Sequence, residues 1–198
     1  AVNKMHEFSF LIYNLVIFPI IAGLLVVNKD FVSFFLGKDF QAANIAIAIM
    51  VFRMFFIGWT NIMGIQILIP HNKHREFMLS TTIPAVVSVG LNLLLIPPFG
   101  FVGASIVSVL TEALVWFIQL YFSLPYLKEV PILESMAKIV CASAMMYGLL
   151  LSAKPFLHFP PTLNVLVYAV LGGLIYLLAI LVLKVVDVKE LKQIIGKN

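Results

Sequence analysis

Long apolar stretches recur along the chain and set its architecture. A helix needs about 20 mostly apolar residues to cross a bilayer. Six stretches come close to or exceed that length, and we predict membrane spans at residues 8–27, 42–69, 78–96, 101–124, 136–153 and 163–184. The pattern therefore predicts an all-α polytopic membrane protein, a bundle of about six transmembrane helices within residues 1–198 that ends in a tail, residues 185–198.

Composition supports this prediction. Hydrophobic residues make up 62% of the 198 residues and charged residues only 11%, whereas soluble domains average about 45–50% and about 25%. A soluble fold could not bury so much apolar surface, so the excess must face lipid. The net charge of +4 would suggest nucleic acid as a partner of a soluble protein. Here the basic residues lie between the apolar stretches, where they act as topology signals, and no nucleic-acid partner is expected.

The basic residues predict which side of the membrane each connection occupies. With the N-terminus inside, nine basic residues fall on the cytoplasmic side and three on the opposite side, and cytoplasmic loops are those enriched in Lys and Arg. The nine are Lys4, Lys73, Arg75, Lys128, Lys138, Lys184, Lys189, Lys192 and Lys197, and the three are Lys29, Lys38 and Lys154. Both ends of this segment, including the tail, are therefore expected in the cytoplasm.

Three connecting segments have distinct patterns. Residues 29–40 place phenylalanines between charged residues, and residues 185–198 alternate apolar and charged residues. Both patterns suit short interfacial helices, the second on the inner leaflet. The Pro-Pro-Phe-Gly sequence at residues 97–100 allows only a tight turn, which makes residues 78–96 and 101–124 an antiparallel neighbouring pair.

Polar side chains within the spans are the candidates for function, because a charge at the centre of a membrane helix costs at least about 2.5–3.5 kcal/mol. Glu112 lies eleven residues after Phe101, which is roughly 16 Å along a helix. Three consecutive spans each carry a polar or small-residue stripe: Arg53 with Thr60, Asn61 and Gly64; Thr81, Ala85, Ser88 and Asn92; and Glu112 with Ser105, Ser108 and Gln119. Such stripes are typical of helices around a partly hydrated cavity. We predict a substrate path formed by Arg53, Glu112, Asn61, Asn92, Thr60, Ser88, Ser108 and Gln119.

Structural interpretations of the same residues stay open. Small and hydroxylated residues let membrane helices pack closely, and Ser and Thr can bond to their own backbone. Arg53 and Glu112 could form a purely structural ion pair. In the cavity interpretation Arg53 attracts an anionic substrate group, and Glu112 adjusts the strength of that attraction or carries a proton. A pair that opens when substrate enters would satisfy both interpretations.

The sequence holds no pattern typical of a metal site, a cofactor site or a hydrolytic centre. His71 and His74 are three positions apart with no further His or Cys nearby, so a solvated loop is the better interpretation. Phosphate-loop, H-E-x-x-H and G-x-S-x-G motifs are absent. The single cysteine, Cys141, excludes an intrachain disulfide and is expected to be a small buried apolar residue. We expect neither a cofactor nor an enzymatic activity.

Residues 61–112 contain three short motifs in sequence. They are G-x-Q-x-L-x-P (Gly64, Gln66, Leu68, Pro70), L-N-x-x-L-I-P (Asn92, Ile96, Pro97) and F-G-x-x-G-A (Phe99, Gly100, Gly103, Ala104), the last leading to Glu112. Together they resemble the C-terminal region of the bacterial polysaccharide flippases. These are the O-antigen, capsule and teichoic-acid exporters of the MATE-like MOP superfamily. The resemblance covers about residues 10–125.

The resemblance implies the C-terminal part of a two-lobed transporter whose N-terminal lobe is missing from this chain. Such a transporter flips undecaprenyl-pyrophosphate-linked oligosaccharide repeat units across the bacterial cytoplasmic membrane by alternating access. Its partners would be lipid-linked oligosaccharide, membrane lipid, and the polysaccharide polymerase and glycosyltransferases of cell-envelope synthesis. Alternatives are another MATE-like exporter of drugs or lipids, a membrane glycosyltransferase or acyltransferase, and a non-catalytic assembly subunit.

Overall fold

The computed structural model describes residues 2–127, 132–156, 159–183 and 185, and every regular element within them is a helix. In chain order these are α1 (Val2–Phe35), the 3₁₀ helix η1 (Lys38–Phe40), α2 (Ala43–Met50), α3 (Arg53–Asn61), the π-helix η2 (Ile62–Leu68), α4 (His74–Leu127), α5 (Ile132–Ala153) and α6 (Pro161–Val182). The predicted all-α class is confirmed. Apart from Val185, the predicted tail lies outside the described residues.

Long apolar helices identify the class of protein. Five of the described helical segments are long and apolar enough to cross a membrane. Their outward faces carry large apolar side chains, such as Leu93, Val86 and Val182, which are 75%, 69% and 77% exposed. Apolar patches of this extent are not left in water by soluble proteins. The chain is a multi-pass α-helical membrane protein. The prediction of about six spans differs from the five helices because α4 contains two of the predicted spans.

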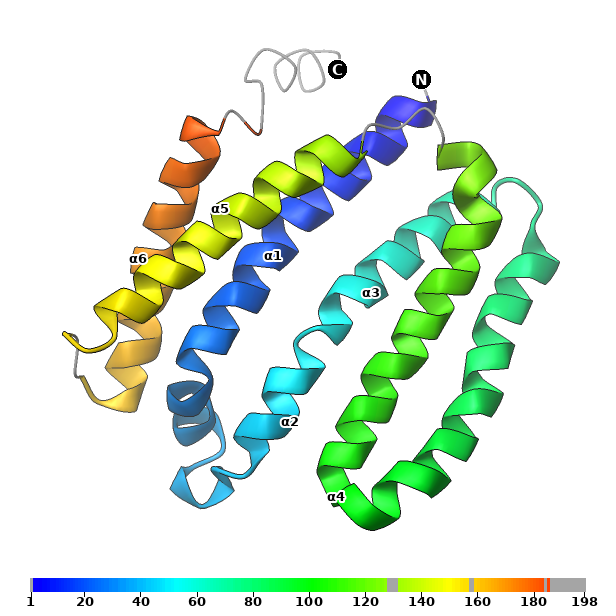
Figure 1. The fold of residues 1–198 in the computed structure, drawn as a ribbon. Helices are drawn as coiled ribbons and strands as arrows, with labels where there is room; N and C mark the ends of the chain where they lie inside the picture. The colour runs from blue at the N-terminus through cyan, green and yellow to red at the C-terminus, as the bar shows by residue number, and fades with distance from the viewer. Residues whose placement is uncertain (1, 128–131, 157–158, 184, 186–198) are drawn as a thin grey trace.

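The longest helix, α4, is a hairpin. Gly100 has φ 54° and ψ −131°, which is not helical, and glycine adopts a positive φ without the steric cost of a Cβ. The chain folds back there, so that a first arm (residues 74–99) and a second arm (residues 101–127) lie antiparallel (Figure 1). A Cβ on Gly103 would lie only 2.2 Å from the Leu95 carbonyl oxygen. The arms therefore touch through their backbones just beyond the predicted turn.

The prediction of a separate interfacial helix over residues 29–40 is wrong for most of that stretch. Helix α1 runs without a break from Val2 to Phe35, eight residues beyond the predicted end of the first span at Val27. No glycine or proline lies between Val27 and Phe35 to stop it. The helix ends before Gly37, whose φ of 95° favours glycine, and only Lys38–Phe40 forms a turn of its own.

The second predicted span, residues 42–69, departs from α-helical geometry twice. Around Arg53 the backbone bonds tighten to i→i+3 spacing, as between the Met54 N–H and the Val51 carbonyl at 3.2 Å. From Ile62 to Leu68 the helix widens into a π-helix, in which bonds run i→i+5. Each change rotates the side chains that follow. Residues that would share one face at 3.6 residues per turn therefore do not all lie on one side of this span.

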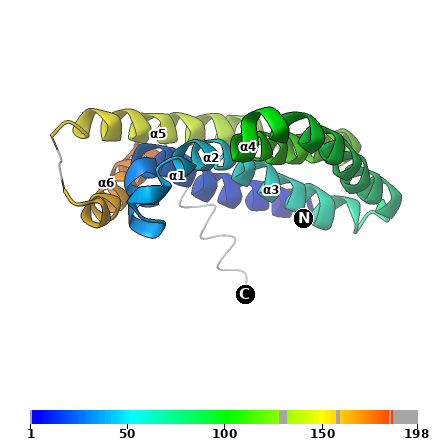
Figure 2. The same ribbon diagram turned by 90° about the horizontal axis from the view of Figure 1, so that it is seen from below.

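The helices form two groups that meet at α1. Helices α1, α5 and α6 share a core that includes Val26, Ile139 and Leu150. The segment from α2 to η2 packs instead against α4, whose second arm runs beside it (Figure 1). Helix α1 also contacts this second group, and the ring centroids of Phe10 and Trp59 lie 4.7 Å apart. Viewed from below, the bundle is broad and flat, with α4 and α5 toward one side and α1, α6 and α3 toward the other (Figure 2).

Candidate functional site

A charged pair joins α3 to the second arm of α4. The Arg53 Nη2 and Nε groups both donate to Oε1 of Glu112, at 2.7 and 3.2 Å. The other ion pairs of the described residues, Lys73–Glu76 and Lys138–Glu134, connect residues only three and four positions apart. Arg53 and Glu112 are 59 positions apart. Within the part of the chain that the structure describes, this is the ion pair that links two helices.

The pair leaves much of its hydrogen-bonding capacity unused. A guanidinium carries five N–H donors, and a carboxylate has two oxygens that accept. Arg53 gives two donors to Glu112, and both reach the same oxygen, so three donors and Glu112 Oε2 take no part in the pairing. The two side chains are 36% and 20% exposed. Arg53 can therefore bind a second anion without first losing Glu112.

The pair forms one wall of a polar pocket of about 300 Å³. The lining residues come from α3 and from both arms of α4: Arg53, Ser88, Asn92, Ala104, Val107, Ser108, Thr111 and Glu112. Six of these eight side chains are polar, although the helices that carry them are strongly apolar. The Ser88 and Thr111 hydroxyls each donate at 2.8 Å to a carbonyl of their own helix, so their oxygens remain free to accept. The pocket offers a cation, a carboxylate, an amide and hydroxyls together.

Five of the eight predicted path residues line this pocket: Arg53, Glu112, Asn92, Ser88 and Ser108. They meet because the turn at Gly100 folds the stripe of the first arm back against the stripe of the second arm. Ala104 and Thr111 also line the pocket but were not among the predicted residues. They lie four positions before and three positions after Ser108, so the helical period of the second arm would have found them.

Two predicted path residues on the second span lie elsewhere. Thr60 is buried and donates to the Ile57 carbonyl at 2.9 Å. Asn61 donates to the same carbonyl at 2.8 Å and lines a different groove, between α1 and α3, with Tyr13 and Gln66. Both residues lie in the same α-helix as Arg53, seven and eight positions further along, which is about 10–12 Å along its axis. They lie too far along α3 to line the Arg53 pocket.

Gln119 lies apart from the pocket for another reason. It is 2% exposed, and its Nε2 donates to Ser80 Oγ at 3.1 Å. A Cβ on Gly64 would lie 3.1 Å from the same nitrogen and 2.6 Å from the Phe77 ring. The stripe on the second arm thus faces α3 at Glu112 and η2 at Gln119. Around Gly64 the stripes are close-packing surfaces, which was the alternative interpretation of the small residues.

The other titratable candidates are not gathered into a site. Within the described residues, no group of three or more His, Cys, Asp or Glu could hold a metal ion. The ring centroids of His71 and Tyr126 lie 4.0 Å apart, and the His71 Nδ1 is 2.7 Å from the Ile67 carbonyl oxygen. Cys141 is exposed on α5, so the expectation of a buried cysteine is wrong.

Comparison with known proteins gives no match: no protein-family model, no curated protein and no solved structure matches the chain.

Proposed function

We propose that the protein is the C-terminal part of a MATE-like flippase that moves undecaprenyl-pyrophosphate-linked oligosaccharides across the bacterial cytoplasmic membrane. The observation that carries the proposal is the Arg53–Glu112 pair at the wall of a polar pocket between apolar helices. Charges within membrane helices are expensive and generally border water or a substrate pathway. The surrounding hydroxyls and amide extend the pair into a surface that can bind a polar head group.

The groups in the pocket match the head group of this substrate. A guanidinium binds phosphate oxygens through paired N–H donors and keeps its charge in a low-dielectric site. Asn92, Ser88 and Ser108 can exchange hydrogen bonds with sugar hydroxyls, while the prenyl tail stays in the surrounding lipid. A volume of about 300 Å³ is at the small end of ligand pockets. This wall would hold part of the head group, and the expected N-terminal lobe would hold the rest.

Glu112 would set how tightly the anion is held. A phosphate that binds the free donors of Arg53 brings negative charge close to the Glu112 carboxylate, and like charges at short range repel. Binding is therefore weaker than at an isolated arginine, which favours release on the other side of the membrane. The tightened and widened turns of the second span are of the kind that mark hinges in helices, and alternating access needs such hinges.

Transfer of a lipid-linked oligosaccharide between vesicle leaflets tests the proposal. The full-length protein, reconstituted into vesicles with a fluorescent undecaprenyl-pyrophosphate oligosaccharide, should speed its movement to the outer leaflet, where a reducing quencher bleaches it. Vesicles with an unrelated polytopic protein are the control. No acceleration over that control would reject the proposal. Formation of a new glycosylated or acylated product would favour the membrane-enzyme alternative.

The proposed orientation makes a separate prediction. In a background in which Cys141, the single cysteine of residues 1–198, and any cysteine of the N-terminal lobe are replaced by serine, Lys73→Cys should react with a membrane-impermeant maleimide only after the cells are opened. A cysteine replacing Lys29, near the far end of α1, should react in intact spheroplasts. This follows from the excess of basic residues on the side of Lys73. The reverse labelling pattern would invert the proposed topology.

A further inference from the structure

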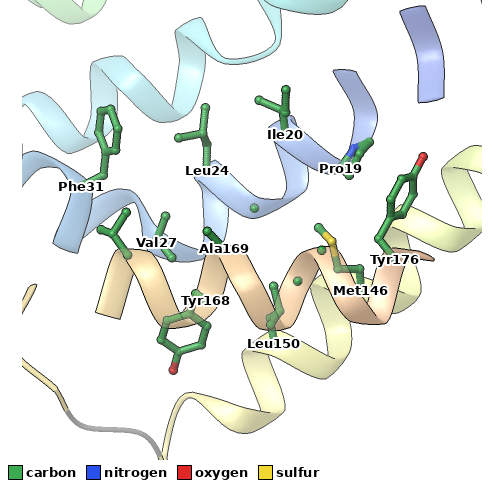
Figure 3. Close-up of a pocket in the computed structure, with 14 residues that line it drawn as sticks. Pro19, Ile20, Leu24, Val27, Phe31, Met146, Leu150, Tyr168, Ala169 and Tyr176 are labelled. Atoms are coloured by element: carbon green, nitrogen blue, oxygen red, sulfur yellow. The ribbon is translucent and has the colours of Figure 1, made fainter. Parts of the chain in front are cut away.

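A second hollow lies in the three-helix group, in a groove between α1 and α6 (Figure 3). Its volume is about 400 Å³. Six lining residues come from residues 19–31 of α1 and six from residues 165–176 of α6, while Met146 and Leu150 of α5 form the floor. No residue of the Arg53 pocket takes part. The groove is a separate feature that the proposed function does not use.

Glycines create the open space. A Cβ on Gly23 of α1 or on Gly173 of α6 would meet no other atom within 4 Å. Gly172, by contrast, faces the floor, where its Cβ would lie 3.2 Å from the Leu150 side chain. The groove is therefore closed by α5 on one side and unfilled between the two glycines.

The groove offers almost no polar group to an occupant. The Tyr176 hydroxyl donates to the Leu15 carbonyl at 2.7 Å. The Tyr168 hydroxyl points away from Leu24 and Ala169 (Figure 3). A polar ligand would give up its bonds to water here without replacement, which is costly. A hydrocarbon chain has no hydrogen bonds to give up, and it makes dispersion contacts that an empty groove would lack.

The dimensions fit one hydrocarbon chain. Residues 19–31 of α1 rise about 18 Å along the helix, so about 400 Å³ over that length gives a mean cross-section of about 22 Å². An α-helix with its side chains is about 10–12 Å across, which is a cross-section of about 80 Å² or more. The groove is therefore too narrow to enclose a helix of another protein.

A basic side chain lies beside the groove, near Val27. Lys154 follows the floor residue Leu150 by four positions, and its Nζ donates to the Val26 carbonyl at 2.8 Å, next to the lining residue Val27. Lysines at helix ends extend their stems along apolar surface and place the ammonium among head groups. We propose that the groove binds one acyl chain of a membrane phospholipid whose phosphate lies at Lys154.

Photocrosslinking tests this site. The protein is reconstituted in phosphatidylethanolamine and phosphatidylglycerol vesicles that contain a trace of phosphatidylethanolamine with a diazirine midway along one acyl chain. After illumination, mass spectrometry should find the label concentrated on residues 20–27 and 165–173. The exposed face of α4 around Leu93 reports ordinary contact with bulk lipid. Equal labelling of the two regions would overturn the proposal.

Filling the groove should exclude the lipid. Gly23→Leu and Gly173→Leu each place a side chain in open space, so the fold should tolerate them. Groove labelling should fall about tenfold, which corresponds to about 1.4 kcal/mol of binding. Gly148→Leu is the matched control, because its Cβ also meets nothing within 4 Å but it lies outside the groove. Unchanged labelling in both groove variants would contradict the proposal.

The head group is tested through Lys154. Lys154→Gln should lower groove labelling by the phospholipid probe severalfold and leave labelling by a diacylglycerol bearing the same diazirine unchanged. Equal effects on both probes would remove the phosphate contact. Two further outcomes would reject the phospholipid: displacement of the probe by an equimolar polyprenyl phosphate, and crosslinks from a photoreactive residue at Ala169 to another polypeptide.

Discussion

Arg53→Gln should lower the transfer of lipid-linked oligosaccharide at least about 100-fold. Hydrogen bonds to charged groups contribute roughly 1.5–3 kcal/mol each, and the free donors of Arg53 can form two with a phosphate. Loss of about 3 kcal/mol corresponds to a rate decrease of more than 100-fold. The measurement is the initial rate of leaflet transfer in vesicles with equal amounts of protein.

Two further substitutions separate this effect from a general loss of charge. Arg75→Gln makes the same chemical change at an exposed position in the first turn of α4 and should leave transfer unchanged. Arg53→Lys keeps the charge but not the planar fork of donors, so its rate should lie between those of the wild type and Arg53→Gln. Wild-type transfer by Arg53→Gln would remove this residue from the mechanism.

Gly103→Ala should destabilise the protein by about 1–3 kcal/mol or more. The added Cβ would lie 2.2 Å from the Leu95 carbonyl oxygen and 2.7 Å from its carbon. Both are backbone atoms, which cannot move aside as a flexible side chain can. Overpacking of this kind costs about 1–3 kcal/mol, and at times more. The substitution should also distort the pocket, because the lining residues Ala104 and Ser108 follow Gly103 on the same arm.

Thermal unfolding in detergent measures this effect, followed by the loss of monodisperse protein with temperature. Gly148→Ala is the control, because its new Cβ would meet no atom within 4 Å. In the middle of a helix this change should be neutral or stabilise by up to about 1 kcal/mol. If the two variants unfolded at the same temperature, the arms of α4 would not touch at Gly103.

Most of the fold could be predicted from the sequence because apolar length and turn residues determine it locally. The helices α5 and α6 lie within a few residues of the predicted spans. The turn of α4 follows from Gly100. The prediction from the sequence was wrong at the end of α1, where two local signals conflict. The end of α1 depends on the absence of a helix breaker before Gly37, and the aromatic-rich pattern of residues 29–35 suggested a surface helix instead.

The site was partly predictable for the same reason. Ser88, Asn92, Ser108 and Glu112 converge because one short turn pairs their two helix arms. Thr60 and Asn61 lie elsewhere because they follow Arg53 by about two turns of α3 and so pass the end of the pocket. The groove between α1 and α6 could not be foreseen, because no pattern in one segment shows that Gly23 and Gly173, 150 positions apart, line the same groove.

The central claim is that the Arg53–Glu112 pair serves a substrate and not only the packing of α3 on α4. The double variant Arg53→Gln/Glu112→Gln tests it most directly, because it removes both charges while keeping hydrogen-bonding side chains of similar size. A structural pair tolerates joint neutralisation. We expect the double variant to be as stable as the wild type in detergent and to transfer lipid-linked oligosaccharide no faster than Arg53→Gln alone. Transfer restored to the wild-type rate would contradict the account.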